Sequence, residues 1–347
     1  MSTKIFYDYP DFPSSFWAKN ADLLFHSKNW IEVLNRTYSL QIIMAQDEGS
    51  EEFLLFGLVD NPFEKKLISL PFSDYSGEDN LSNSSAFEII EALQKKFPAF
   101  NIVFKSRFYS FNLSASEEKK PTRSAFYHRI LIKDLKPNQI KNNQSSSFHR
   151  GVRKALKEEV SVQKTCAKED IEEFYDLYAN LRLEKFGIIP QPFCFFKNIW
   201  ELFLLEEKGF LLKAVYKNKT IASIFILEHK NKWYYKFGAS AKDHLKKRPN
   251  NLLFYKLVEL AEEEQVEFID LGMSGSGKNY EGLRRFKEEM GGHLFPINVY
   301  EFDALQPDEI EKEDKKVLEK FTSLIVSEKP PLKKVSELSE FLYPFFV

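Results

Sequence analysis

The sequence is short of the residues from which several kinds of site are built. It has only two cysteines, Cys166 and Cys194, in 347 residues, which are too few and too far apart for a disulfide framework or a zinc site. Its six histidines are dispersed, and the motifs H-E-x-x-H and G-x-S-x-G are absent. The sequence therefore predicts no metal site and no strong nucleophile constellation.

Long apolar runs and an excess of one charge are also lacking. No run approaches the ~18 apolar residues that a membrane-spanning helix needs, and the start, MSTKIFYDYPDF, has neither the basic nor the apolar region of a signal peptide. The formal net charge is only -2, so the chain as a whole is not attracted to DNA or to an anionic membrane. We therefore expect a cytoplasmic protein that does not bind DNA, in which any anion site is a local patch.

The composition is that of a soluble protein with ample material for a core, with 43% hydrophobic and 29% charged residues. The length predicts two domains, and the polar segment 137–147 marks a boundary between them. Residues 1–145 and 146–305 both give helix, strands, helix and strand in the same rough order, and 306–347 reads as a charged helical tail. The predicted fold class is α/β (α+β), with a mixed, mostly antiparallel sheet flanked by helices in each domain.

Hydrophobic periodicity and turn signals place the individual elements. Helices are predicted at 25–38, 85–97, 148–159, 168–186, 193–208 and 251–264. Strands are predicted at 42–45, 53–59, 66–70, 101–104, 126–132, 160–164, 210–217, 220–229, 232–239, 268–271 and 296–302. Ser27 is expected to cap the first helix, and Asp60-Asn61-Pro62 to turn a hairpin.

A basic face lies on the helix predicted at 148–159. Arg150, Arg153, Lys154 and Lys157 follow at i, i+3, i+4 and i+7, so their charges share one side of the helix. Like charges in this arrangement repel one another unless an anion is present, and arginine binds phosphate oxygens bidentately. The face is therefore either a phosphate-binding site or a solvated surface, and both interpretations remain open.

A strand–loop–helix unit follows at WYYKFGASAKDHLKKRPNNLLFYKLVELA. The strand ends at Gly238, a basic loop runs to Arg248, and a helix begins with Asn250 or Asn251 as its cap. A helix N-terminus offers free backbone N–H groups and a positive dipole end, which suit a pyrophosphate. The alternative is a solvated basic loop with an ordinary helix cap.

Two further segments contain residues that could act in chemistry. Residues 272–279, GMSGSGKN, differ by one position from the phosphate loop G-x-x-x-x-G-K-[ST], because Asn279 replaces the hydroxyl that would bind Mg²⁺. This predicts a flexible Gly/Ser loop rather than a nucleotide-hydrolysing site. In LPFSDYSG, Asp74 lies on an aromatic-flanked loop, where it either forms a turn or acts as a base toward an amine.

Several motifs together resemble one family. RGVRKALKEEVSV, LRLEKFGIIPQP, YYKFGAS, RPNNLLFYKLVELA, FIDLG and GLRRFKEEMGG occur in order and resemble the C-terminal domain of FemAB-like acyltransferases of the GNAT superfamily. LPFSDYSG resembles a motif of their N-terminal domain, so the resemblance covers roughly 25–302. It implies two tandem GNAT-like domains that move an acyl or aminoacyl group onto an amine. The best-known members extend peptidoglycan stem peptides from aminoacyl-tRNA.

The resemblance also implies roles for particular residues. Lys287 matches the lysine of the FK-x-x-x-G motif and is implied to meet the donor near the reaction centre, with Asp74 and Glu301 as candidate catalytic acids. Arg153 and Lys154 match a basic motif implied to contact a phosphorylated ligand. The predicted substrate- and phosphate-binding set is Arg150, Arg153, Lys154, Tyr235, Arg248 and Asn250.

Two departures from the family pattern leave the donor open. The GNAT acetyl-CoA signature R/Q-x-x-G-x-G/A is replaced by LKKRPNN, and no long helical hairpin for holding tRNA is found. We expect no tightly bound cofactor, either acyl-CoA or aminoacyl-tRNA as donor, and a small-molecule or lipid-linked amine as acceptor, which leaves room for peripheral membrane association. The predicted function is N-acyl transfer onto a cell-envelope or polysaccharide precursor. The alternatives are acyl-CoA-dependent transfer to another amine and a catalytically silent module that binds a nucleotide-sugar or lipid-linked precursor.

Overall fold

The computed structural model describes residues 3–19, 23–50, 52–75, 83–106, 111–114, 117–133, 139–307 and 312–346. The chain forms two compact units that are each discontinuous in sequence. Unit 1 comprises Met1–Ala125, Pro296–Phe321 and Leu342–Val347, and unit 2 comprises Phe126–Phe295 and Thr322–Phe341. These units are defined by contacts between residues, and the domain ranges 1–145, 146–305 and 306–347 stay a prediction.

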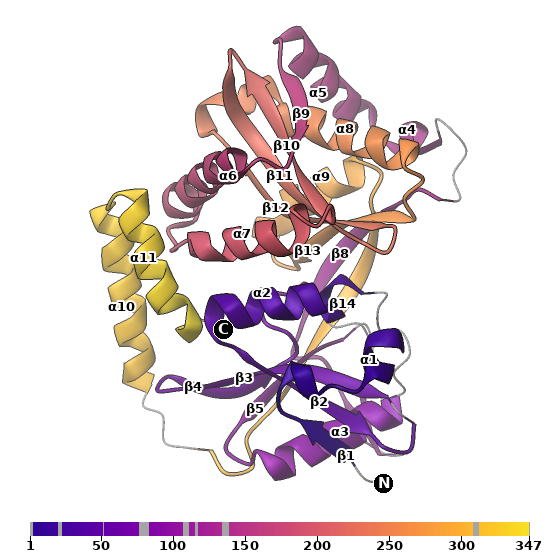
Figure 1. Ribbon diagram of the computed structural model, residues 1–347, viewed down its shortest axis with the longest axis vertical. Coiled ribbons are helices and arrows are strands. Elements are labelled where there is room, and N and C mark those ends of the chain that lie inside the picture. The colour runs from indigo at the N-terminus through magenta and orange to yellow at the C-terminus, as the bar shows by residue number, and fades with distance from the viewer. Residues whose placement is uncertain are drawn as a thin grey trace. The chain divides into compact units, whose positions relative to one another are not determined.

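The sheet of unit 1 has the strand order β1-β2-β3-β4-β5-β14. All its pairs are antiparallel except the parallel pair β4–β5. Helices α2 and α3 lie on opposite sides of this sheet (Figure 1), which is why the middle strands are buried on both faces. The elements are β1 (Thr3–Phe6), η1 (Tyr9–Asp11), α1 (Ser14–Lys19), η2 (Leu24–His26), α2 (Lys28–Tyr38), β2 (Gln41–Asp47), β3 (Phe53–Asn61), β4 (Glu64–Ile68), α3 (Asn83–Lys96), β5 (Asn101–Ser106) and β14 (His293–Phe302).

Local side-chain chemistry sets two of these boundaries. The Oγ of Ser27 accepts a hydrogen bond of 3.2 Å from the backbone N–H of Trp30 and so caps α2. Asn61 Oδ1 accepts from the backbone N–H groups of Phe63 and Glu64, at 2.9 and 3.0 Å, and closes the turn between β3 and β4. The predicted cap and hairpin are therefore confirmed. Between β5 and β8, the short strands β6 (Phe111–Ser114) and β7 (Glu117–Lys119) pair with each other.

The sheet of unit 2 has the order β8-β13-β12-β11-β10-β9. The meander β9 to β12 is antiparallel, and β13 joins β12 in parallel. Helices α6 and α7 cover one face of this sheet and α5 and α8 the other (Figure 1). The elements are β8 (Arg123–Leu131), α4 (Gln139–Asn143), α5 (Ser146–Lys157), β9 (Ser161–Thr165), α6 (Lys168–Leu181), η3 (Arg182–Phe186), α7 (Phe193–Ile199), η4 (Trp200–Leu204), β10 (Gly209–Tyr216), β11 (Lys219–His229), β12 (Lys232–Ser240), η5 (Lys242–Lys247), α8 (Pro249–Glu263), β13 (Phe268–Gly275), η6 (Lys278–Tyr280) and α9 (Glu281–Glu289).

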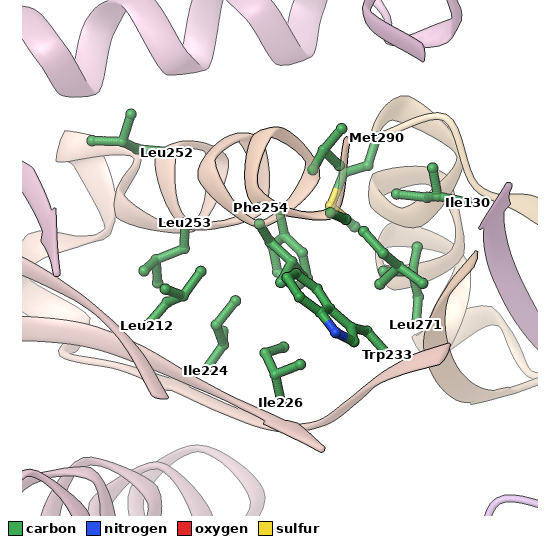
Figure 2. Close-up of a cluster of buried hydrophobic side chains, with 14 of the residues drawn as sticks. Ile130, Leu212, Ile224, Ile226, Trp233, Leu252, Leu253, Phe254, Leu271 and Met290 are labelled. Carbon is green, nitrogen blue, oxygen red and sulfur yellow. The ribbon is translucent and has the colours of Figure 1, made fainter. Parts of the chain in front are cut away.

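Alternation along β11 divides the core of unit 2 between two layers. Ile224 and Ile226 lie on the α8 side, where Leu253 and Phe254 pack toward the strands (Figure 2). Phe225 points to the other face, where its ring lies 5.3 Å from that of Phe174 on α6. Successive residues of a strand face opposite sides, so both faces of this strand are apolar and both are covered. The predicted class of mixed, mostly antiparallel sheets flanked by helices is confirmed.

The chain ends in two helices, α10 (Lys312–Glu328) and α11 (Leu332–Leu342), and a short turn, η7 (Tyr343–Phe345). Within unit 2, the backbone N–H of Phe193 donates a 2.9 Å hydrogen bond to the hydroxyl of Ser336 on α11. Across the described ranges, no helix combines the length and the apolar content needed to span a membrane.

Candidate active site

Strands β12 and β13 pair over only a short part of their length. Their parallel register consists of Trp233 with Ile269 and Tyr234 with Asp270, although β12 continues to Ser240 and β13 to Gly275. Beyond Tyr234, these two strands form no further backbone pairs with each other. Unpaired strand edges offer N–H and C=O groups to an extended ligand, so this separation is a natural place for a substrate to enter the sheet.

A cavity of about 1120 Å³ lies in unit 2, beside the end of β12. Its walls come from α6, η3, the start of β11, the end of β12, η5, the first residues of α8, and α9. Small-molecule sites usually measure roughly 300–1,000 Å³. The cavity is therefore large enough to hold a donor and an acceptor side by side.

A bulge in β12 shapes one wall of the cavity. Phe225 pairs with Phe237 and Ile226 with Tyr235, so Lys236 is an extra residue in the register between β11 and β12. The ring of Tyr235 packs edge-on against Phe254 at 4.9 Å and lies over Gly238, where an added Cβ would be 2.4 Å from the tyrosine hydroxyl. Position 238 must therefore remain a glycine for Tyr235 to keep its place.

The N-terminus of α8 forms the adjoining wall. Pro249 is its first residue, and Arg248 precedes it in the left-handed region with φ 59° and no side-chain cap. The predicted cap at Asn250 or Asn251 is wrong, because proline is well suited to the first helical position and moves the start of the helix forward. Asn250 instead accepts a 2.8 Å hydrogen bond from the hydroxyl of Ser240, which joins the helix to the end of β12.

Lys287 contributes a buried positive charge to the cavity wall. Its side chain is only 2% exposed, and Nζ donates to the carbonyl oxygens of Gly272 at 2.8 Å and Met273 at 3.1 Å. These bonds hold α9 against β13 and fix the position of the ammonium group. A cation held in this way can stabilise negative charge that develops beside it without having to reorganise.

The segment before α9 is more regular than the sequence indicates. The predicted Gly/Ser loop 272–279 is wrong for its first half, because β13 extends through Gly275. The guanidinium of Arg284 donates to the carbonyl oxygens of Gly275 and, at 3.2 Å, Gly277, so α9 also fixes the end of the strand. None of the residues 272–279 is among those that line the cavity.

A buried histidine lies close to this lysine. Burial, together with the charges of Lys287 and Arg284, lowers the pKa of His128 to about 4. Its Nε2 is 4.0 Å from the half-exposed carboxylate of Glu288, and neither ring nitrogen has a hydrogen-bond partner in the described part of the chain. His128 is therefore neutral in the folded protein at neutral pH.

This histidine should make unit 2 acid-sensitive. The unfolded chain binds a proton at His128 below pH 6.5 while the folded chain does not until about pH 4, so stability is lost as pH falls through that window. Between pH 7 and pH 5, His128→Leu should reduce the loss of unfolding free energy by about 2 kcal/mol. Urea unfolding of both proteins at the two pH values measures this. An unchanged pH dependence in the variant would contradict the assignment.

Sequence reasoning missed the acidic residues of α6 and η3. Glu173, Asp176 and Glu184 line the cavity together with Asn180, but the segment 168–186 was predicted only as a helix. The signal was present, because these positions follow at i, i+3, i+7 and i+11 and so share one helical face. Burial and the charges of Glu172 and Glu173 raise the pKa of Asp176 above its ordinary value.

The structure brings together three of the nine predicted site residues. Lys287, Tyr235 and Asn250 all line the cavity. Arg248 is exposed just before α8, and Arg150, Arg153 and Lys154 are exposed on α5, outside the cavity lining. The basic face on α5 therefore stays a prediction of a phosphate contact separate from the cavity.

The two predicted acids belong to unit 1. Asp74 is half-buried in the segment after β4, and the carbonyl of its neighbour Ser73 accepts a 2.7 Å bond from Lys105. Glu301 lies on β14, with its carboxylate 3.2 Å from the guanidinium of Arg123. Their catalytic roles stay predictions.

Residues 142–288 match the family model of the acetyltransferase (GNAT) domain. This range contains α5 to α8, the meander β9 to β12, β13 and nearly all of α9, and so every residue that lines the cavity except Met290. A search of curated proteins gives no significant match.

Several solved structures share the fold. The crystal structure of FemX is 14% identical, with a TM-score of 0.56 over 86% of this chain and 97% of FemX. The C-terminal domain of a protein assigned as a lysylphosphatidylglycerol synthetase in Agrobacterium fabrum is 11% identical, with a TM-score of 0.51 over 86% of this chain and 92% of that domain. A tandem GNAT protein from the clavulanic acid biosynthesis pathway is 10% identical, with a TM-score of 0.52 over 88% of this chain and 100% of that protein. At these identities the likeness is one of fold.

Proposed function

We propose that this protein is an N-acyltransferase, because residues 142–288 match the acetyltransferase (GNAT) domain model and the chain shares its fold with FemX. It moves an acyl or aminoacyl group from acyl-CoA or aminoacyl-tRNA onto an amine of a cell-envelope or polysaccharide precursor. The name lysylphosphatidylglycerol synthetase, carried by a protein of this fold, supports a lipid-linked precursor as the molecule that carries the acceptor group.

The observation that carries the proposal is the cavity beside the end of β12. The free edge of β12 suits an extended donor arm, and the N-terminus of α8 suits a phosphate group. The ammonium of Lys287 is fixed in the wall of the same cavity. Donor, phosphate and positive charge thus have places within one domain.

The reaction needs positioning more than a nucleophile from the protein. The acceptor nitrogen attacks the carbonyl carbon of the thioester or ester, and the carbonyl oxygen becomes an oxyanion that the charge of Lys287 stabilises. The C–S or C–O bond then breaks. The nitrogen loses a proton to a carboxylate or water, and the leaving thiolate or alkoxide takes one up. Holding two substrates in reactive geometry supplies much of the rate enhancement.

The proposal is tested by thermal-shift screening of coenzyme A esters, aminoacyl-tRNA analogues and UDP-sugars, followed by assays of thiol or tRNA release with amines. A true donor at 100 times its Kd should stabilise the protein by about 2.7 kcal/mol. A flat response to every acyl donor would contradict the proposal. Stabilisation by UDP-sugars alone, without transfer, would instead support a silent binding module.

Gly238→Ala should impair transfer by displacing Tyr235. The new Cβ would lie 2.4 Å from the tyrosine hydroxyl and 3.1 Å from its ring, so the side chain must leave its place in the cavity wall. We expect kcat/KM to fall about tenfold to hundredfold, as measured by thiol release. Adding Tyr235→Phe removes the closest clashing atom and should restore part of the loss. A double variant as impaired as Gly238→Ala would contradict this explanation.

A further inference from the structure

The basic face of α5 carries charges that carboxylates of the chain do not neutralise. It consists of four exposed cations, Arg150, Arg153, Lys154 and Lys157. Within the described ranges none of these four forms an ion pair with a carboxylate, and the bond of 3.3 Å that Arg150 donates goes to the uncharged hydroxyl of Ser146. Like charges at these spacings destabilise a helix. A surface that keeps them together is complementary to an anionic partner.

The short helix η5 extends this positive charge along the surface of unit 2. Nζ of Lys247 lies 2.7 Å from the carboxylate of Glu158, the residue that ends α5. The hydrogen bond from Lys247, together with the charges of Lys247, Lys154 and Lys157, lowers the pKa of Glu158. This acid therefore lies among lysines of both elements. Two further cations of the segment are exposed, Lys246 and Arg248. The basic face and η5 thus form one continuous cationic surface.

Exposed leucines accompany these cations. Leu156 on α5 is 55% exposed, and Leu245 in η5 is 47% exposed. Leu156 follows Arg153 at i+3 and is therefore its neighbour on the helix surface. Cations beside exposed aliphatic side chains are typical of proteins that dock on anionic lipid, because the cations meet phosphate headgroups while the aliphatic groups enter the acyl region.

A nucleic acid fits this surface less well than a lipid does. Proteins bind unpaired bases by stacking aromatic side chains on them. The large apolar side chains that α5 and η5 expose are both leucines, which have no ring to stack. The chemistry of the surface therefore favours phosphate headgroups with acyl chains beneath them.

We propose that the basic face of α5, together with η5, docks this protein on the surface of an anionic membrane. Lys242, Asp243 and Leu245 of η5 also line the cavity, so a membrane in contact with η5 lies beside the cavity. A lipid-linked acceptor in that membrane is then close to the place where we propose acyl transfer. Docking itself requires no transfer, and the inference therefore goes beyond the proposed function.

The test is cosedimentation of the full chain with sucrose-loaded vesicles of phosphatidylcholine, alone or mixed equally with phosphatidylglycerol. The wild type should bind the mixed vesicles and release them at high salt. Each cation near such a surface is worth about fivefold in affinity, so the double variant Arg153→Gln, Lys154→Gln should bind about thirtyfold more weakly. Leu156→Gln should weaken binding severalfold without a change of charge.

The matched control removes two exposed lysines from the other face of the sheet. Lys168→Gln on α6 combined with Lys197→Gln on α7 makes the same change of charge and should bind the mixed vesicles as the wild type does. All of these positions except Lys197, which pairs with Glu201 at the surface, lack an ion pair in the described part of the chain. The variants should therefore unfold at about the temperature of the wild type.

Three results would overturn the docking surface. The first is no binding of the wild type to the mixed vesicles, and the second is equal binding by the double variant Arg153→Gln, Lys154→Gln. The third is displacement of the vesicles by polyuridylate with no effect of Leu156→Gln, which would assign the surface to nucleic acid. Because no acyl donor is present, a failure of docking is separate from a failure of the proposed transfer, which is assayed with soluble amines.

Discussion

Replacing Lys287 with methionine is expected to lower kcat/KM for acyl transfer by about a hundredfold or more. Removing one fixed electrostatic contact to a developing oxyanion typically costs a factor of 10²–10³, and methionine keeps the length of the side chain while removing its charge. The measurement is steady-state release of free thiol or deacylated tRNA in the presence of acceptor. The loss should appear mainly in kcat, because the charge acts on the transition state.

Folding must be separated from chemistry in this experiment. Methionine leaves the carbonyls of Gly272 and Met273 without the bonds that Lys287 donates, and an unsatisfied buried group costs about 1–3 kcal/mol. Arg285→Met on the same helix is the matched control, because Arg285 is exposed and outside the cavity lining. Suppose that the Lys287→Met variant unfolds at about the same temperature as the wild type, binds the donor and transfers the acyl group as fast. Lys287 would then have a structural role only.

Asp270→Ala should destabilise unit 2 by about 3–5 kcal/mol, which is the usual cost of breaking a buried ion pair. Asp270 is 1% exposed. Its Oδ2 accepts a 3.1 Å bond from Nε of Arg129, and its Oδ1 a 2.8 Å bond from the backbone N–H of Gly272. The guanidinium of Arg129 also lies 4.2 Å from the ring centroid of Phe268, so the variant leaves a packed cation without its counter-charge.

Urea unfolding, followed by tryptophan fluorescence and circular dichroism, measures this loss. Glu267→Ala is the control, since it removes the carboxylate of a half-exposed pair with Lys232 at 3.9 Å, and such surface pairs contribute less than about 1 kcal/mol. Equal losses in the two variants would mean that the Asp270–Arg129 pair is no more important than one on the surface. Because Gly272 and Lys287 meet next to Asp270, we expect activity to fall together with stability.

The sequence predicted elements best where one local signal decides the structure. Ser27 caps α2 and Asn61 turns the β3–β4 hairpin as expected, because each acts on backbone groups within three residues. The cap of α8 was misplaced because two asparagines follow a proline, and proline at the first helical position outweighed them. The length of β13 was also underestimated, because its glycines and serines indicate a loop. The bonds that Lys287 donates to the carbonyls of Gly272 and Met273 help to keep this backbone extended, and the local sequence does not reveal them.

The candidate site was predictable only in part, for a similar reason. Lys287 was found through a motif, and Tyr235 and Asn250 through the strand–loop–helix that contains them. Asp176 was not found, since an acidic residue on an amphipathic helix usually faces water. What distinguishes it is the cavity beside α6, and a cavity depends on contacts between segments that are far apart in sequence.

The discontinuity of unit 1 has a consequence for synthesis on the ribosome. Its sheet needs β14, whose residues Asn298–Phe302 pair with Ile102–Ser106 of β5, and Tyr300 and Phe302 complete the core against α3. Nearly two hundred residues separate β5 from β14, so at common translation rates the first five strands wait about ten seconds or longer for the sixth. Until then β5 presents an open edge to other chains. Unit 2 lies almost wholly within that interval, and its own sheet can form before unit 1 is closed.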